Sequence, residues 1–125
     1  MKKEKAKADG SSAPVVLCGA SAYEQKYYLN ESFQNLPEQI KEELQVMCVL
    51  YTEDVGGVFL LEFDEDGTLQ FCTEAKEDDY SYDEIGSILK IKELRRTKED
   101  LLRSIELYYK VLTGKVRVED ISETQ

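Results

Sequence analysis

The apolar positions between Leu36 and Tyr51 recur every three or four residues and predict an amphipathic helix. Asn35 has the side chain of a helix N-cap, and Pro37 is typical of a first helical turn. Additional apolar residues widen the stripe in the second half, so we expect that half to be buried almost all round. The helix should end at Gly56, because glycine accepts the left-handed backbone that ends many helices.

Two runs rich in β-forming residues follow, 58–63 and 68–73, and an Asp-Glu-Asp-Gly loop joins them. Such a pair predicts a β-hairpin. Because successive strand residues point to opposite faces, Phe59, Leu61 and Phe63 share one face. We expect that face to belong to the hydrophobic core.

The N-terminal region carries a short β-branched run, Val15–Cys18, and then Tyr23–Leu29 with three tyrosines. We interpret these runs as two short strands around a turn. The four-residue spacing of Tyr23 and Tyr27 is also that of a helical turn, so a helix remains an alternative here.

The last third of the chain predicts one long helix over residues 82–112. Ser81 and Glu84 have the spacing of a capping box, and the continuity of the helix through Gly86 stays open. Beyond it, steps of three and four residues alternate as in a coiled-coil seam that contains one lysine. The seam residues are Ile91, Leu94, Lys98, Leu101, Ile105, Tyr108 and Leu112.

The order strand, strand, helix, hairpin, long helix predicts an α+β fold, a small antiparallel sheet with helices packed on one face. We expect one domain over residues 15–113. A flexible basic tail, 1–14, should precede it, and an acidic, frayed C-terminus, 114–125, should follow it. The pattern does not determine the order of the strands in the sheet.

Charge narrows the range of functions. Sixteen Lys and Arg stand against 26 Asp and Glu, a formal net charge of −10. An acidic surface repels phosphate backbones, so we expect no nucleic-acid binding. The apolar runs are too short to cross a bilayer, so we expect no membrane insertion. Three widely spaced cysteines without a CxxC pair or a signal peptide favour reduced thiols in a cytoplasmic protein.

The candidate chemistry is sparse. The chain has no histidine, which removes the commonest general base and metal ligand. Neither a phosphate-binding glycine loop nor a GxSxG elbow occurs, so we expect no enzyme and no cofactor. Cys18 beside Gly19 is a candidate reactive thiol, although such a residue is more often a small buried hydrophobe. The Asp-Gly loop matches part of a calcium-binding pattern but has Thr73 where the bidentate Glu belongs, which favours a hairpin turn.

One stretch carries a resemblance to a known family. The stretch Leu-Cys-Gly-Ala-Ser-Ala-Tyr-Glu-Gln-Lys-Tyr-Tyr-Leu-Asn opens the segment from Val16 to Leu50. Together with the Gly56-Gly57 hairpin and the Ile85–Leu112 helix, it resembles a family of small uncharacterised proteins of anaerobic Gram-positive bacteria. The resemblance covers most of residues 16–112. It implies a bacterial cytosolic setting, and it implies no catalytic or binding residue.

These observations favour a non-enzymatic protein–protein interaction or self-associating module. The seam of the long helix would be its surface, and its partner would be another protein or a second copy in a homodimer. The alternative is a sensor of a small molecule or divalent cation. It would use Tyr23, Tyr27 and Tyr28 with the acidic loop of residues 74–84, because aromatic rings with polar tips often line ligand pockets.

Overall fold

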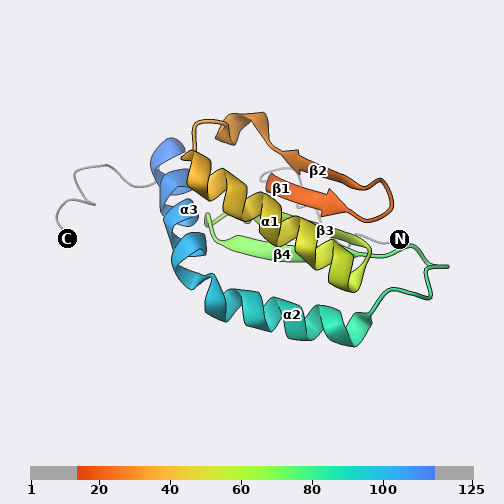
Figure 1. Cartoon of the computed structure of the whole chain (residues 1–125). Helices are drawn as coiled ribbons and strands as arrows, with labels where there is room; N and C mark the ends of the chain where they lie inside the picture. The colour runs from red at the N-terminus through yellow and green to blue at the C-terminus, as the bar shows by residue number, and fades with distance from the viewer. Residues whose placement is uncertain (1–13, 115–125) are drawn as a thin grey trace.

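The computed structural model describes residues 14–114, which form four strands, three α-helices and one short 3-10 helix (Figure 1). In chain order these are β1 (Val15–Ser21), β2 (Lys26–Leu29), η1 (Glu31–Phe33), α1 (Glu38–Val55), β3 (Val58–Phe63), β4 (Leu69–Glu74), α2 (Glu84–Thr97) and α3 (Glu99–Leu112). The α+β class is therefore confirmed. Residues 15–21 and 26–29 form two strands around a turn at 22–25, so the helical alternative is wrong, and the second strand begins at Lys26 instead of Tyr23.

The four strands form one antiparallel sheet in the order β2-β1-β3-β4. The first strand of the chain is thus central, with β2 on one side and the β3–β4 hairpin on the other. Ala20 of β1 lies opposite Phe59 of β3, which in turn lies opposite Thr73 of β4. This register brings the apolar sides of the three strands to the same face.

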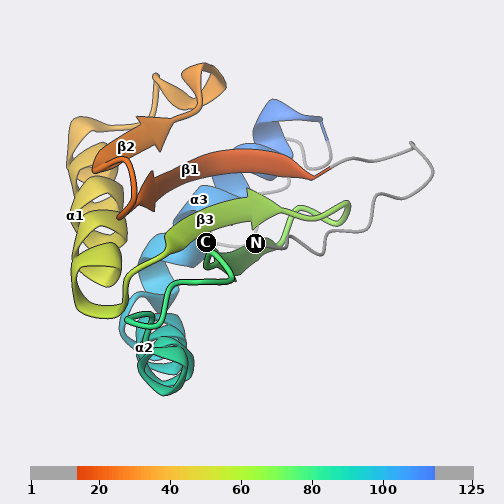
Figure 2. The same ribbon diagram turned by 90° about the vertical axis from the view of Figure 1, so that its right-hand side faces the viewer.

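All three helices contact that face of the sheet. The ring of Tyr51 in α1 stacks on Phe59 with centroids 4.0 Å apart, and Tyr109 of α3 stacks on Phe63 at 3.9 Å. The Arg95 guanidinium of α2 lies 4.8 Å from the centroid of the Phe71 ring. Figure 2 shows α1 beside one face of the sheet and α2 below it. The prediction of helices packed on one face is confirmed.

The β3–β4 connection is a hairpin turn, as predicted. Asp64 Oδ1 accepts hydrogen bonds from the backbone N–H groups of Asp66 and Thr68, at 2.9 and 3.0 Å. Gly67 has a φ of 84°, in the left-handed region. Phe63 at the end of β3 is 1 % exposed, so the expected core face is present.

Helix α1 ends as expected at Gly56, whose φ is 95°, but it differs from the prediction at two other points. It begins at Glu38 after Pro37 and no side chain caps it, so the cap assigned to Asn35 is wrong. Its second half is not buried all round. Val46 and Leu50 are exposed, because the sheet and α2 cover only part of the helix surface.

The predicted long helix is two helices, and this prediction is wrong. The helix continues through Gly86, but the chain bends at Lys98, whose φ and ψ are −111° and 21°. Thr97 Oγ1 donates to the carbonyl of Glu93 at 3.0 Å, a contact that often bends helices. Glu99 and Asp100 then start α3, where acidic side chains favour a helix N-terminus. The bend separates the seam into two segments.

The start of α2 also differs from the prediction. Asp83 is the N-cap and its Oδ1 accepts from the Gly86 N–H at 2.8 Å, so the capping box assigned to Ser81 and Glu84 is wrong. The predicted flexible tail and frayed C-terminus fall almost entirely on residues 1–13 and 115–125, which lie outside the described residues.

Candidate interaction surface

The predicted seam does not form one continuous surface. Leu94 and Ile105 are buried in the core, 8 % and 0 % exposed. Ile91, Leu101 and Tyr108 are partly buried against the same core. These five side chains help to hold α2 and α3 on the sheet.

The other two seam residues have different surroundings. Lys98 Nζ lies 3.2 Å from Oε2 of Glu43 in α1, so it makes an ion pair at the corner between α2 and α3. Leu112, at the end of α3, is 52 % exposed. The structure thus does not bring the seven seam residues together as one binding face.

Polar contacts set the orientation of α2 against α1. The hydroxyls of Tyr51 and Ser87 are 2.7 Å apart in the buried contact between the two helices. Lys90 Nζ lies 3.2 Å from Asp54 Oδ2 at the end of α1. Because Ser87, Leu94 and Lys90 turn toward the core or α1, the opposite side of α2 is turned to solvent.

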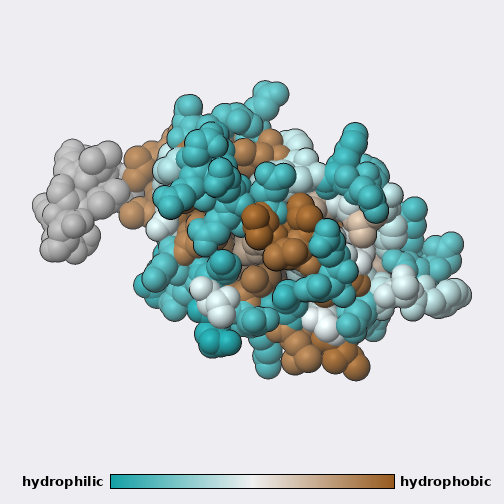
Figure 3. Space-filling view, in the orientation of Figure 1, coloured by the Kyte–Doolittle hydropathy of each residue, from teal (hydrophilic) through white to brown (hydrophobic). Residues whose placement is uncertain are grey.

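That opposite side carries a cluster of exposed apolar residues. Ile85 is 71 % exposed, and Ile88 and Leu89 are each 61 % exposed. Spacings of three and four residues place them on one side of the helix, and we call these three residues the outer face of α2. Figure 3 shows brown, apolar atoms at the lower edge of the molecule, along the first half of α2, and another apolar patch over α1.

Charges of opposite sign border the outer face. Glu84 precedes the three apolar residues, and Lys92 and Arg96 follow them one and two turns later, all three exposed. Among the described residues, neither Lys92 nor Arg96 makes an ion pair. The outer face is therefore acidic at one end and basic at the other.

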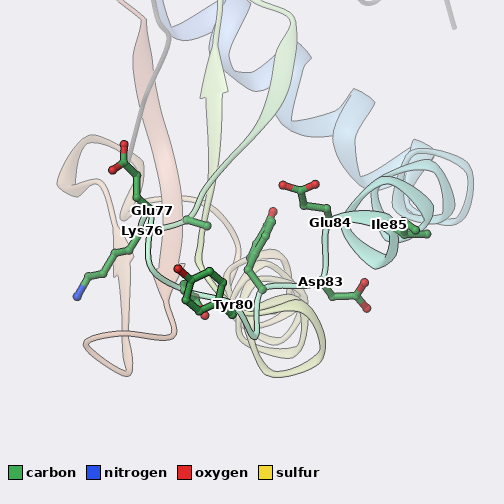
Figure 4. A pocket seen from close by; sticks show the side chains of 9 residues that line it. Lys76, Glu77, Tyr80, Asp83, Glu84 and Ile85 are labelled. Carbon is green, nitrogen blue, oxygen red and sulfur yellow. The ribbon is translucent and has the colours of Figure 1, made fainter.

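The acidic loop before α2 has a definite conformation. Tyr23 donates its hydroxyl hydrogen to Asp79 Oδ2 at 2.6 Å and accepts from the Lys76 N–H at 3.0 Å. The hydrogen bond from Tyr23 lowers the pKa of the Asp79 carboxyl. The pKa of Tyr23 is raised, mainly by burial and also by its hydrogen bond to Asp79. The loop lines a hollow of about 570 Å³, in which Figure 4 shows Glu84 and Ile85 on the side of α2.

The three tyrosines of the alternative hypothesis lie apart. Tyr23 contacts the acidic loop, and Tyr28 is 54 % exposed on β2. Tyr27 lines a different hollow, of about 510 Å³, with residues of β1 and α1. Its hydroxyl is buried, and burial raises the pKa of this phenol.

Cys18 lies in the core beside Cys48 of α1, with the two sulfur atoms 3.8 Å apart and both side chains inaccessible to solvent. The contact with Cys18 and burial both raise the pKa of the Cys48 thiol. A reactive cysteine is usually an accessible thiolate. The surroundings of Cys18 are those of a small buried hydrophobe.

Two further properties concern the described residues, 14–114. No helix in this range combines the length and apolar character that a membrane span requires. No group of three or more acidic or cysteine side chains in it is arranged to hold a metal ion.

The seam residues of α2, Ile91 and Leu94, face the core. The sequence pattern includes Ile88 and Leu89 in the apolar surface of the long helix but not in the seam, and it does not single out Ile85. A helix that lies on a core needs only one apolar stripe, so the sequence signal for a second surface is the presence of apolar residues outside that stripe.

The sheet, the three helices on one face and the exposed outer face of α2 define a small α+β domain. The chain belongs to a family of unknown function, DUF6145, whose model matches residues 14–117. No curated protein and no solved structure matches the chain.

Proposed function

We propose that this protein is a non-enzymatic interaction module that binds a protein partner, or a second copy of itself, through the outer face of α2. The observation that carries the proposal is the exposure of Ile85, Ile88 and Leu89 on one side of one helix. Scattered exposed apolar residues are ordinary, but contiguous ones with a polar border are typical of interaction sites.

The other exposed apolar residues are weaker candidates for the binding surface. Val46 and Leu50 form a pair on α1, and Leu107 and Leu112 lie further apart on α3. Glu42 and Glu53 border the α1 pair on its own helix, so its surroundings there are acidic only. The outer face of α2 has more apolar residues and charges of both signs.

The proposal extends to where the protein is found. We propose a bacterial cytoplasmic protein, on the basis of the family resemblance and of the three free cysteines. We propose no cofactor and no catalytic residue, because the sequence has no histidine, no phosphate-binding glycine loop and no GxSxG elbow. We propose no nucleic-acid partner, because the net charge of −10 repels phosphate. A partner that presents exposed basic groups suits this field, and a second copy presents such groups locally at Lys92 and Arg96.

A sensor of a small molecule or divalent cation is the second candidate. The hydrogen bond from Tyr23 to Asp79 favours it, because it holds the acidic loop in place around a hollow. Thermal unfolding with millimolar Ca²⁺, Mg²⁺ and metabolite mixtures tests it. A midpoint that rises with one ligand in the wild type, but not in Asp79→Asn, would support a sensor.

Affinity capture from the source organism tests the interaction module. The tagged full chain is compared with Leu89→Lys and with the control Leu107→Lys, which places the same change on an exposed leucine of α3. We expect a stoichiometric partner, or untagged copies, with the wild type and Leu107→Lys but not with Leu89→Lys. Equal capture by all three would contradict the proposal.

A further inference from the structure

We infer that the partner at the outer face of α2 is a second copy of this chain, with the two α2 helices packed antiparallel across a twofold axis near Ile88 and Leu89. This inference rests on the proposed function and names the partner of the same surface. It uses the order of charged and apolar residues along the helix.

The outer face is self-complementary only in the antiparallel direction. Along this side of α2 the exposed residues run from Glu84 through the apolar Ile85, Ile88 and Leu89 to Lys92 and Arg96. Oε1 of the exposed Glu93 beside them lies 4.0 Å from Nζ of Lys90 in the same helix. A twofold axis at the apolar centre brings the acidic end of one helix to the basic end of the other. Such an isologous contact uses the same patch on both copies.

The spacing fits this geometry. Glu84 and Lys92 are about 6 Å before and after Ile88, since an α-helix rises 1.5 Å per residue. Across the axis, Glu84 of each copy therefore lies opposite Lys92 of the other. Within one helix the two residues are about 12 Å apart along the axis, too far for an ion pair with each other.

A parallel arrangement would place like charges together. Glu84 would then oppose Glu84 and Lys92 would oppose Lys92, which costs free energy at both ends. The acidic loop strengthens the preference, because the Tyr23 hydroxyl donates to the Asp79 carboxylate and the Asp79 N–H donates to the Lys76 carbonyl, which holds Asp79 in place before α2. In the antiparallel pair this loop faces the Arg96 end of the other copy.

The small size of the contact indicates a weak, reversible association. A contact between two helices and their flanking loops lies at the small end of specific interfaces, below about 1,200 Å². We therefore expect a reversible dimer with a dissociation constant of about tens of micromolar. The measurement is sedimentation equilibrium of the full chain from about 1 µM to 1 mM, a range that spans the affinity expected for this contact.

Single substitutions test the face. Leu89→Lys should weaken the dimer at least tenfold, about 1.4 kcal/mol, because each dimer carries the change twice. Leu107→Lys, the matched control on α3, should leave the constant within about twofold. Far-UV circular dichroism and thermal unfolding check that each variant is folded.

A charge exchange tests the direction. Glu84→Lys alone and Lys92→Glu alone should each weaken self-association, because each creates two like-charge contacts. Mixing the two variants should restore association, since both contacts of the mixed dimer then join opposite charges. Rescue by mixing cannot arise from a change within one chain, so it reports an intermolecular pair. Single variants that associate like the wild type would overturn the antiparallel arrangement.

The remaining outcomes are also decisive. A monomer at about 1 mM overturns the second copy as partner. If such a monomer still captures another protein through Leu89, the proposed function stands and only this inference fails. A dimer that Leu50→Lys breaks and Leu89→Lys does not would assign self-association to α1 and overturn the inference.

Discussion

At the residue scale, the hydrogen bond between Tyr51 and Ser87 joins α1 to α2 inside the core. Tyr51 is 0 % exposed and Ser87 5 % exposed, so neither hydroxyl can exchange this partner for water without movement of the helices. Burial raises the pKa of Tyr51, so the phenol stays protonated and able to donate.

Removal of the Tyr51 hydroxyl should therefore destabilise the fold. We expect Tyr51→Phe to lower the free energy of unfolding by about 1–2 kcal/mol, because the Ser87 hydroxyl loses a buried partner while the stack on Phe59 remains. Urea denaturation measures it. Tyr51→Phe with Ser87→Ala should cost less than the sum of the two single changes. Tyr80→Phe, at a residue 92 % exposed, is the control and should be neutral.

Asp64 provides a pH-dependent contribution. Burial opposes its ionisation, but hydrogen bonds from the Thr68 and Asp66 N–H groups and from Gln70 outweigh burial and lower its pKa below the usual value. A carboxyl with a depressed folded-state pKa stabilises the fold above its unfolded pKa, near 3.8. That contribution disappears as the pH falls through the lower folded-state value.

The variant Asp64→Asn should remove this contribution. We expect a loss of up to about 1 kcal/mol at pH 7, because charged acceptors bind N–H groups more strongly than neutral ones. The difference from wild type should shrink steadily below pH 4. Denaturant unfolding at several pH values measures it, with Asp66→Asn as the control in the same loop. A difference independent of pH would contradict the assignment.

At the element scale, the bend at Lys98 changes the role of the C-terminal residues. It turns α3 so that Tyr109 stacks on Phe63 and Glu106 Oε2 accepts from the Leu69 N–H at 2.8 Å. Helix α3 therefore closes the core at the turn end of the hairpin, and its apolar residues stabilise the fold of each chain.

Substitutions along α3 distinguish core from surface. Ile105→Ala should lower the free energy of unfolding by about 2–4 kcal/mol, because the side chain is 0 % exposed and the core cannot fully close around the cavity. Leu112→Ala, at a half-exposed residue, should change it by less than about 0.5 kcal/mol. Similar small effects at both positions, in the same denaturation experiment, would contradict the placement of Ile105.

The same bend shows why sequence alone predicted some elements and not others. The β3–β4 hairpin and α1 were predictable, because a period of two or of 3.6 residues with glycine at the end leaves one local solution. The bend at Lys98 was not, because Leu94, Leu101 and Ile105 keep helical spacing across it. Only contacts with α1 and the hairpin, distant in sequence, show that the helix changes direction.

The candidate surface was predictable to a smaller extent. The pattern identified the C-terminal region as apolar and charged, but it could not separate core-facing residues such as Leu94 from outward ones such as Leu89. That distinction depends on which side of α2 packs on α1, where α2 contacts Tyr51 and Asp54. The strand order β2-β1-β3-β4 was equally open, since local pattern does not specify which strands pair.

At the scale of the whole molecule, the cysteines report on global unfolding. Cys18 and Cys48 are fully buried between the sheet and α1, whereas Cys72 is only partly buried on β4. With iodoacetamide at neutral pH, we expect Cys72 to react first, and Cys18 and Cys48 only when the fold opens. Mass spectrometry of alkylated peptides measures the order. Rapid alkylation of Cys18 in the native protein would contradict its placement.

The mode of attachment of α2 has a consequence for its motion. Six residues of α1 are buried, but only Ser87 and Leu94 of α2 are, and the Tyr51–Ser87 hydrogen bond and the Lys90–Asp54 ion pair join α2 to α1. Elements held by few apolar contacts open at lower free energy than the core. Amide hydrogens of α2 should therefore exchange with deuterium sooner than those of α1. The proposed binding surface therefore lies on a helix that should open before α1, and a bound partner should slow its exchange.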